Sequence, residues 1–197
     1  METTDIAWTE GTWLNPPEAA SAEGGHLLVT AHEGSDLWRV TSYGFVHADG
    51  HALLVDLPEG SAAEVSFVCD FSGEFDQAGA LVYGDDRTWT KTGVEFSDGL
   101  HQVGAVVTRD VSDWSTAPFP QWAGKEVTVR VSRRGDALTI RARADGEWHL
   151  VRLAPIDPTL AWRVGPYCCA PTRAGLEVRF TRFAMGPADA ALHAEGH

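Results

Sequence analysis

Side chains able to hold a polar ligand recur at two-residue spacing in the stretch DRTWTKTGVEF, residues 86 to 96. Trp89, Lys91 and Glu95 occupy alternate positions around Gly93, and threonine, valine and phenylalanine fill the positions between them. Because side chains alternate across a β-strand, the first set shares one face. An indole can stack on the apolar face of a sugar ring, while charged groups pair with its hydroxyls. The pattern therefore indicates a sugar-type binding site.

A second stretch, QAGALVY, repeats this rhythm. Gln77, Gly79, Leu81 and Tyr83 share one face if the stretch is a strand. If it pairs with the first stretch, amide, ammonium, carboxylate and aromatic groups form one band across two strands. Gly79 and Gly93 would then leave space for a ligand to approach the backbone. We therefore predict a polar cleft in a sheet.

Further candidates come from the segment after the apolar run VGAVVT. Arg109 ends that run, and we expect SDWS, which follows, to be a polar loop with an exposed tryptophan. Trp38 and Tyr167 are candidates for an aromatic rim. We assign no catalytic residue, metal or cofactor. The predicted ligand-binding residues are Trp38, Gln77, Trp89, Lys91, Glu95, Arg109, Ser112, Asp113, Trp114 and Tyr167.

Each candidate also has a purely structural interpretation. Lys91 and Glu95 could form a salt bridge on a solvated sheet face, where such a pair contributes roughly 0–1 kcal/mol. Trp38 and Trp89 could be core residues, since the chain has 8 tryptophans and one site needs few. A role in turns is the alternative for Asp113, Asp76 and Gln77.

The elements that must position these residues are short strands. Turn signals rich in glycine recur at roughly 8–12-residue spacing, as in antiparallel sandwiches, and no long amphipathic helix is indicated. The meander over residues 127 to 155 alternates apolar with polar residues, so we expect one wet face. Besides the opening stretch, strands are predicted at 26–31, 51–57, 62–71, 77–84, 101–109, 125–133, 137–144, 148–154, 160–167 and 176–185.

Length and charge limit the class of protein. The chain has 197 residues and a formal net charge of −13, which disfavours binding to nucleic acid or to an anionic membrane surface. We expect one β-sandwich domain over residues 1–187, because all-β domains of about 200 residues are common. Residues 188–197 are Ala-rich, and we expect a flexible tail there.

The first twenty residues show neither a basic start nor an apolar run of a secretory signal. No segment approaches the roughly 20 apolar residues of a membrane span. The cysteines, Cys69, Cys168 and Cys169, are odd in number and lack metal-site spacing. We therefore expect reduced, buried thiols and a cytoplasmic protein.

Three stretches together resemble the DUF1349 family: SDLWRVTSYGF (35–45), DQAGALVYGDDRTWTKTGVEFSDG (76–99) and VVTRDVSDWS (106–115). The resemblance covers about residues 8 to 185. It implies an all-β, concanavalin A-like jelly-roll sandwich of two curved antiparallel sheets, a fold whose concave face holds sugars in related families. One member is described as a regulator of enolase, which implies a metabolic enzyme as a partner. The resemblance implies no reaction.

A glycosidase of this fold would resemble its relatives in an E-x-D-x-E or E-x-D-x-x-E run. Glu74 and Asp76 begin such a run, but Ala78 and Gly79 stand where its last glutamate belongs. The sequence therefore favours a non-catalytic protein that binds a glycan or similar polyhydroxylated small molecule. Two alternatives remain: a sugar-modifying enzyme that uses Glu95, paired with Asp113 or Asp76, and a regulatory protein that docks on a metabolic enzyme.

Overall fold

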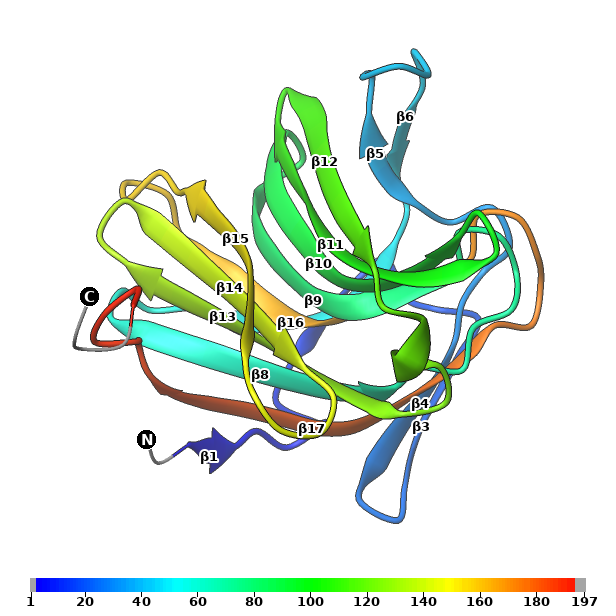
Figure 1. Ribbon diagram of the computed structural model, residues 1–197, viewed down its shortest axis with the longest axis horizontal. Helices are drawn as coiled ribbons and strands as arrows, with labels where there is room; N and C mark the ends of the chain where they lie inside the picture. The colour runs from blue at the N-terminus through cyan, green and yellow to red at the C-terminus, as the bar shows by residue number, and fades with distance from the viewer. Residues whose placement is uncertain (1–2, 194–197) are drawn as a thin grey trace.

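Two antiparallel sheets pack face to face in the computed structural model, which describes residues 3–193. The seven-stranded sheet, here called the front sheet, has the order β12 (Val111–Pro118), β11 (Leu100–Arg109), β10 (Thr88–Ser97), β9 (Gln77–Asp85), β16 (Arg163–Cys169), β7 (His51–Asp56) and β2 (Thr12–Leu14). Figure 1 shows β9 to β12 curving as a group. This curved surface includes β10, which contains Trp89, Lys91 and Glu95.

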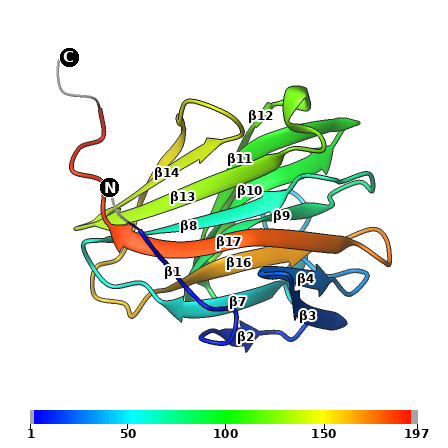
Figure 2. The ribbon, with the colours of Figure 1, turned by 90° about the horizontal axis from the view of Figure 1, so that it is seen from below.

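The eight-stranded sheet, here called the back sheet, lies behind it. Its order is β15 (His149–Pro155), β14 (Ala137–Arg143), β13 (Glu126–Arg134), β8 (Ser61–Val68), β17 (Glu177–Pro187), β4 (His26–Thr30) and β3 (Ala19–Glu23). The short strand β1 (Thr4–Asp5) pairs with β17, beside which it lies in Figure 2. A 3-10 turn, η1 (Pro120–Trp122), leads from β12 toward β13.

A hairpin of β5 (Leu37–Arg39) and β6 (Val46–Ala48) forms a small sheet of its own. In Figure 1 it stands to the right of β12, and β5 contacts β12. The sequence does not indicate it, because its strands are short and Gly44 is the one glycine in its turn. Val40 and Ser42 both have φ of 66°, which is an uncommon conformation for residues with a side chain and a strained one for β-branched valine.

The core between the sheets follows the predicted alternation of side chains. Val129 and Val131 of β13 are fully buried, as are Ala80 and Val82 of β9, and all belong to one hydrophobic cluster. The all-β sandwich of two antiparallel sheets is therefore confirmed. In the described residues no helix is long and apolar enough to cross a membrane.

The strand pattern differs from the prediction at SDWS. These residues are not a loop but part of β12, which pairs with β11 along its length. Adjacent side chains there point to opposite faces of the front sheet. Trp114 lies opposite Val106, on the curved face, whereas Asp113 lies opposite Val107 of the core.

A row of glycines crosses the front sheet where it curves. Gly79 of β9 faces Gly93 of β10, which faces Gly104 of β11. A Cβ at Gly93 would lie 2.0 Å from the carbonyl oxygen of Ala78, and one at Gly79 would lie 2.0 Å from that of Thr92. Glycine is therefore required at Gly79 and Gly93 by the close approach of neighbouring backbones. Gly93 also borders a small crevice of about 20 Å³.

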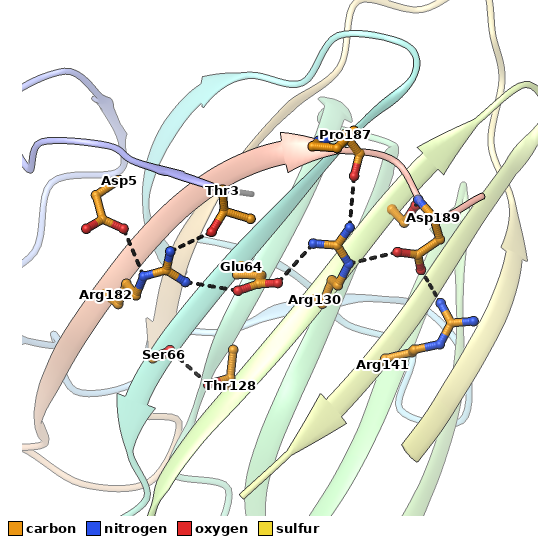
Figure 3. A network of polar contacts seen from close by, with 11 residues as sticks. Thr3, Asp5, Glu64, Ser66, Thr128, Arg130, Arg141, Arg182, Pro187 and Asp189 are labelled. Atoms are coloured by element: carbon orange, nitrogen blue, oxygen red, sulfur yellow. Dashed lines mark hydrogen bonds and ion pairs between the residues drawn. The ribbon is translucent and has the colours of Figure 1, made fainter. Parts of the chain in front are cut away.

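The outer face of the back sheet is polar, but it is not as wet as expected. Arg130 donates to Glu64 Oε1 at 2.9 Å and to Asp189 Oδ1 at 2.9 Å, and Arg182 donates to Glu64 Oε2 at 2.9 Å (Figure 3). Arg182 also pairs with Asp5. This network lies over β13 and β14 of the meander, and through Asp189 it anchors the beginning of the segment expected to be a flexible tail. Residues 194–197 of that segment lie outside the described residues.

Candidate functional site

A cavity of about 350 Å³ opens on the curved face of the front sheet. Its floor comes from β9, β10 and β11, and one wall comes from the β5–β6 hairpin. Five of the predicted ligand-binding residues line it together: Trp38, Gln77, Lys91, Glu95 and Trp114. The alternation of side chains along two strands therefore brought the amide, ammonium and carboxylate to one place.

The ammonium of Lys91 lies at the centre of the polar floor. Its Nζ donates to Asp36 Oδ1 at 2.8 Å and to Gln77 Oε1 at 2.8 Å. Gln77 Nε2 in turn donates to the carbonyl of Phe75 at 3.1 Å, which fixes the orientation of the amide. Lys91 therefore pairs with Asp36 and not with Glu95, so the predicted alternative of a Lys91–Glu95 surface salt bridge is wrong.

Burial and charge oppose each other at Lys91, whose residue is only 3% exposed. Burial acts to lower its pKa, but Asp36, and then Cys169 and Glu95, favour the charged form, and the net shift of the pKa is upward. The ammonium therefore stays charged at neutral pH. A buried charge of this kind needs its partner, because removing one member of such a pair costs about 3–5 kcal/mol.

Glu95 is the unpaired group of the floor. Within the described residues its carboxyl makes no hydrogen bond and no ion pair, and it lies four positions along β10 from Lys91 on the same face. Burial raises the pKa of Glu95 to about 7, against the opposing effect of the Lys91 ammonium. The carboxyl is therefore divided between its neutral and charged forms near neutral pH.

Aromatic rings form the walls. Trp38 contacts Tyr43 edge-on at 5.6 Å between ring centroids and Trp114 at 6.4 Å. Tyr43 stacks on Phe45 at 5.3 Å, and Phe45 meets His47 edge-on at 4.9 Å. The chain thus supplies a continuous aromatic surface over a polar floor.

The hairpin is held by contacts at its base. The backbone N–H of Arg39 donates to Ser112 Oγ at 2.9 Å, and its guanidinium Nε donates to the carbonyl of Asp110 at 3.0 Å. Trp38 Nε1 donates to the carbonyl of Thr41 at 3.0 Å. Ser112, predicted to contact ligand, is buried and serves as this anchor.

Two predicted aromatic residues lie on the curved face but do not line the cavity. Trp89 is fully buried in a second hydrophobic cluster on the curved face, with Leu81 and Tyr83, which agrees with its alternative interpretation as a core residue. Tyr167 is also buried there, and it borders a small adjoining crevice of about 20 Å³. Both pack in the apolar cluster beside the polar floor.

Two predicted polar residues lie away from the cavity. Arg109 ends β11 and donates to the carbonyl of Pro155 in the back sheet. Asp113 points away from the curved face and pairs with Arg152 Nη2 at 2.7 Å. Neither side chain shares the cavity with Lys91.

The carboxylate partners considered for Glu95 in an enzyme are both engaged elsewhere. Asp113 is paired with Arg152, as described. Asp76 is completely buried, accepts the backbone N–H of Gly73 at 2.8 Å and pairs with Arg173 at 2.6 Å, in keeping with its alternative role in a turn. The second carboxylate of the cavity is Asp36, which Lys91 holds. Over residues 3–193 no three potential metal-ligating side chains of His, Cys, Asp or Glu cluster.

Most of the lining residues that the sequence did not indicate come from the hairpin and the segment before it: Gly34, Asp36, Tyr43, Phe45 and His47. The others are Phe75 before β9, Val106 of β11, and Pro171 and Thr172 after β16. Tyr43, Phe45 and His47 alternate in SYGFVH, a period-2 signal that would have placed them on one face of a strand. Nothing local marks Asp36 as the partner of a lysine 55 residues later.

Comparison with known proteins identifies relatives over nearly the whole chain. Residues 13–188 match the family described as "Protein of unknown function (DUF1349)". The chain is 37% identical over 195 residues to "Regulation of enolase protein 1" of Saccharomyces cerevisiae, covering 98% of each chain. A crystal structure of a functionally unknown protein from Saccharomyces cerevisiae superposes with a TM-score of 0.88 at 35% identity, over 94% of this chain and 100% of that one.

More distant structures share the fold alone. The GH43 protein BlXynB of Bacillus licheniformis superposes with a TM-score of 0.71 at 15% identity, over 94% of this chain but only 39% of that one. The sandwich described above therefore corresponds to part of that longer protein, and the likeness concerns architecture.

The raised pKa of Glu95 makes stability depend on pH. Because the folded-state pKa of about 7 exceeds the ordinary value of 4.5, the neutral carboxyl stabilises the fold fully below pH 4.5, and this contribution is lost as pH rises through 7. We expect Glu95→Gln to gain stability relative to the wild type by about 2 kcal/mol between pH 5 and pH 8, measured by urea unfolding. Glu126 is exposed, so Glu126→Gln is the control, and its free energy of unfolding should vary with pH as that of the wild type does. If the free energy of unfolding of Glu95→Gln also varies with pH as in the wild type, the raised pKa of Glu95 is contradicted.

Proposed function

The chain belongs to the DUF1349 family, and from this premise and the geometry of its cavity we propose that it binds a carbohydrate or similar polyhydroxylated small molecule. The observation that carries the proposal is the meeting of Gln77, Lys91 and Glu95 under a wall of aromatic rings. Sugars need both surfaces, because their ring faces are apolar and their edges are hydroxyls.

The floor retains hydrogen-bonding capacity for a ligand. An ammonium has three N–H donors, and the described residues accept two from Lys91. Glu95 has both carboxyl oxygens available. Trp114, 38% exposed at the rim, offers an indole face for stacking. A hydroxyl both donates and accepts, so it suits an ammonium beside a carboxyl.

We propose binding without turnover. Two-carboxylate glycoside hydrolysis needs one carboxyl to act as acid and another as nucleophile or base. In this cavity the second carboxylate, Asp36, is already paired: it accepts a hydrogen bond from the Lys91 ammonium at 2.8 Å. The sequence also lacks the complete E-x-D-x-E run. A cytoplasmic setting is part of the proposal, supported by three free buried cysteines.

The test is a screen of mono- and disaccharides, both neutral and amino-substituted, by isothermal titration calorimetry. We expect a ligand whose affinity falls about tenfold in Trp114→Ala, since stacking on an aromatic ring contributes roughly 0.5–1.5 kcal/mol beyond the buried area. Trp148→Ala is the matched control, because Trp148 borders a different hollow, on the back sheet. The proposal is wrong if no sugar binds, or if both variants bind as the wild type does.

A second candidate function is docking on a metabolic enzyme. It is favoured by the likeness to a protein named for regulation of enolase and by exposed apolar side chains at the hairpin. Val40, Tyr43, Phe45 and Val46 are 42%, 56%, 43% and 50% exposed, which is unusual for a cluster of large apolar groups.

Purified enolase offers a direct test of docking by surface plasmon resonance. Val46 does not border the cavity, so Val46→Asp should abolish docking and leave ligand binding intact. Leu150→Asp, at a residue 50% exposed on β15, is the matched control. Docking is excluded as an activity of this surface if enolase does not bind the wild type, or if Val46→Asp and Leu150→Asp behave alike.

A further inference from the structure

We infer that the ligand of the cavity carries a cationic nitrogen beside its hydroxyls, as a protonated amino sugar does; the inference rests on the proposed function and specifies its ligand class. It stands on three features of the cavity: which charges are already paired, which rings face the space, and which group is left without a partner.

The charges of the floor are not equivalent. The Lys91 ammonium and the Asp36 carboxylate compensate each other at 2.8 Å. His47 borders the cavity and lies 3.4 Å from Asp49 outside it. Among the described lining residues, Glu95 is thus the charged group without a hydrogen bond or ion pair. When ionised, its carboxylate gives the cavity an uncompensated negative charge.

The rings add to this preference. Trp38, Tyr43, Phe45 and Trp114 all border the same space. The face of an aromatic ring is electron-rich, so several rings around one space attract an alkylammonium group, and the attraction grows as water is excluded. An aromatic enclosure with one carboxylate is therefore better matched to a cation than to a neutral N-acetyl group.

An anionic ligand is disfavoured by the same arrangement. A uronate or phosphate would have to compete with Asp36 for Lys91 and approach Glu95. The net charge of −13 on the whole chain would also repel an anion during encounter and attract a cation. The negative net charge of the protein and the pairing of Lys91 with Asp36 therefore both disfavour an anionic ligand.

Glu95 couples ligand charge to pH. The groups that act on it are Lys91 on its own strand, Asp36 before β5 and Glu74 before β9, with the buried hydroxyl of Tyr167 on β16 and His47 of β6 across the cavity. Burial raises the pKa of Glu95 to about 7. A cation bound beside it stabilises the ionised form, so binding should release a proton near neutral pH.

A matched set of sugars separates the three charge types. The probes for calorimetry at pH 7 are D-glucosamine and N-acetyl-D-glucosamine, which differ only in the substituent on C2, and D-glucuronate, which carries a carboxylate at C6. We expect glucosamine to bind at least tenfold more tightly than the other two, with proton release detected in buffers of different ionisation enthalpy. In Glu95→Gln this preference should fall to less than threefold; Trp148→Ala should retain it.

Choline isolates the pH dependence, because its trimethylammonium charge is fixed. We expect its affinity to rise roughly tenfold from pH 5.5 to pH 8 in the wild type and to stay level in Glu95→Gln. His47 also borders the cavity, so His47→Gln is the control variant, and it should retain the pH dependence that Glu95 carries. A flat profile in the wild type overturns the inference.

The outcomes also separate this inference from the proposed function. Equal binding of glucosamine and N-acetylglucosamine, or tighter binding of glucuronate, overturns the cationic ligand and leaves the carbohydrate site standing. Choline binding without any sugar binding supports the cation and overturns the sugar. If no probe binds, both are wrong.

Discussion

A buried ammonium is the constraint on which the site depends. Lys91 places its charge among apolar side chains of the curved face, where an unpaired ion is strongly unfavourable. Asp36 and Gln77 resolve this, each at 2.8 Å. Because Gln77 begins β9 and Asp36 immediately precedes β5, the same pair of contacts joins the floor of the sheet to the base of the hairpin. The electrostatic requirement of one side chain thus fixes the position of the aromatic wall relative to the polar floor.

The central strands of the front sheet, β9 and β10, are buried on both faces over most of their length, which is why the sheet can hold a partly desolvated carboxyl. One face packs on the back sheet, and on the other Leu37 and Trp38 of the hairpin pack with Trp89 in the second hydrophobic cluster. The glycine row at Gly79, Gly93 and Gly104 lets the backbones of three strands come close where the sheet curves. Glu95 lies just beyond that row. Its raised pKa follows from this placement, since burial disfavours the charged form more than Lys91 restores it.

The two-residue periodicity predicted the polar residues of the cavity floor but not the β5–β6 hairpin that forms one of its walls. The two-residue rhythm put Gln77, Lys91 and Glu95 on one face, and β9 pairs with β10 as that required. Sequence could not reveal that Lys91 would find Asp36, because that contact depends on how a distant loop folds back. Arg109 and Asp113 were predicted to bind ligand but lie away from the cavity, for a different reason. Their residue types suit ligand binding, but once 111–118 forms a strand, Asp113 must point opposite to Trp114, and Arg109 lies at the strand end. The hairpin escaped prediction because its turn relies on residues such as Val40 in an uncommon backbone conformation.

The most direct test of this electrostatic arrangement is an NMR titration of the Glu95 side-chain carboxyl carbon in the wild type, Lys91→Met and Asp36→Asn. Lys91 lowers the pKa of Glu95 and Asp36 raises it, so the account predicts a midpoint near 7 in the wild type, a higher midpoint in Lys91→Met and a lower one in Asp36→Asn. A wild-type midpoint near the ordinary value for glutamate, or variants that leave the midpoint in place, would contradict it.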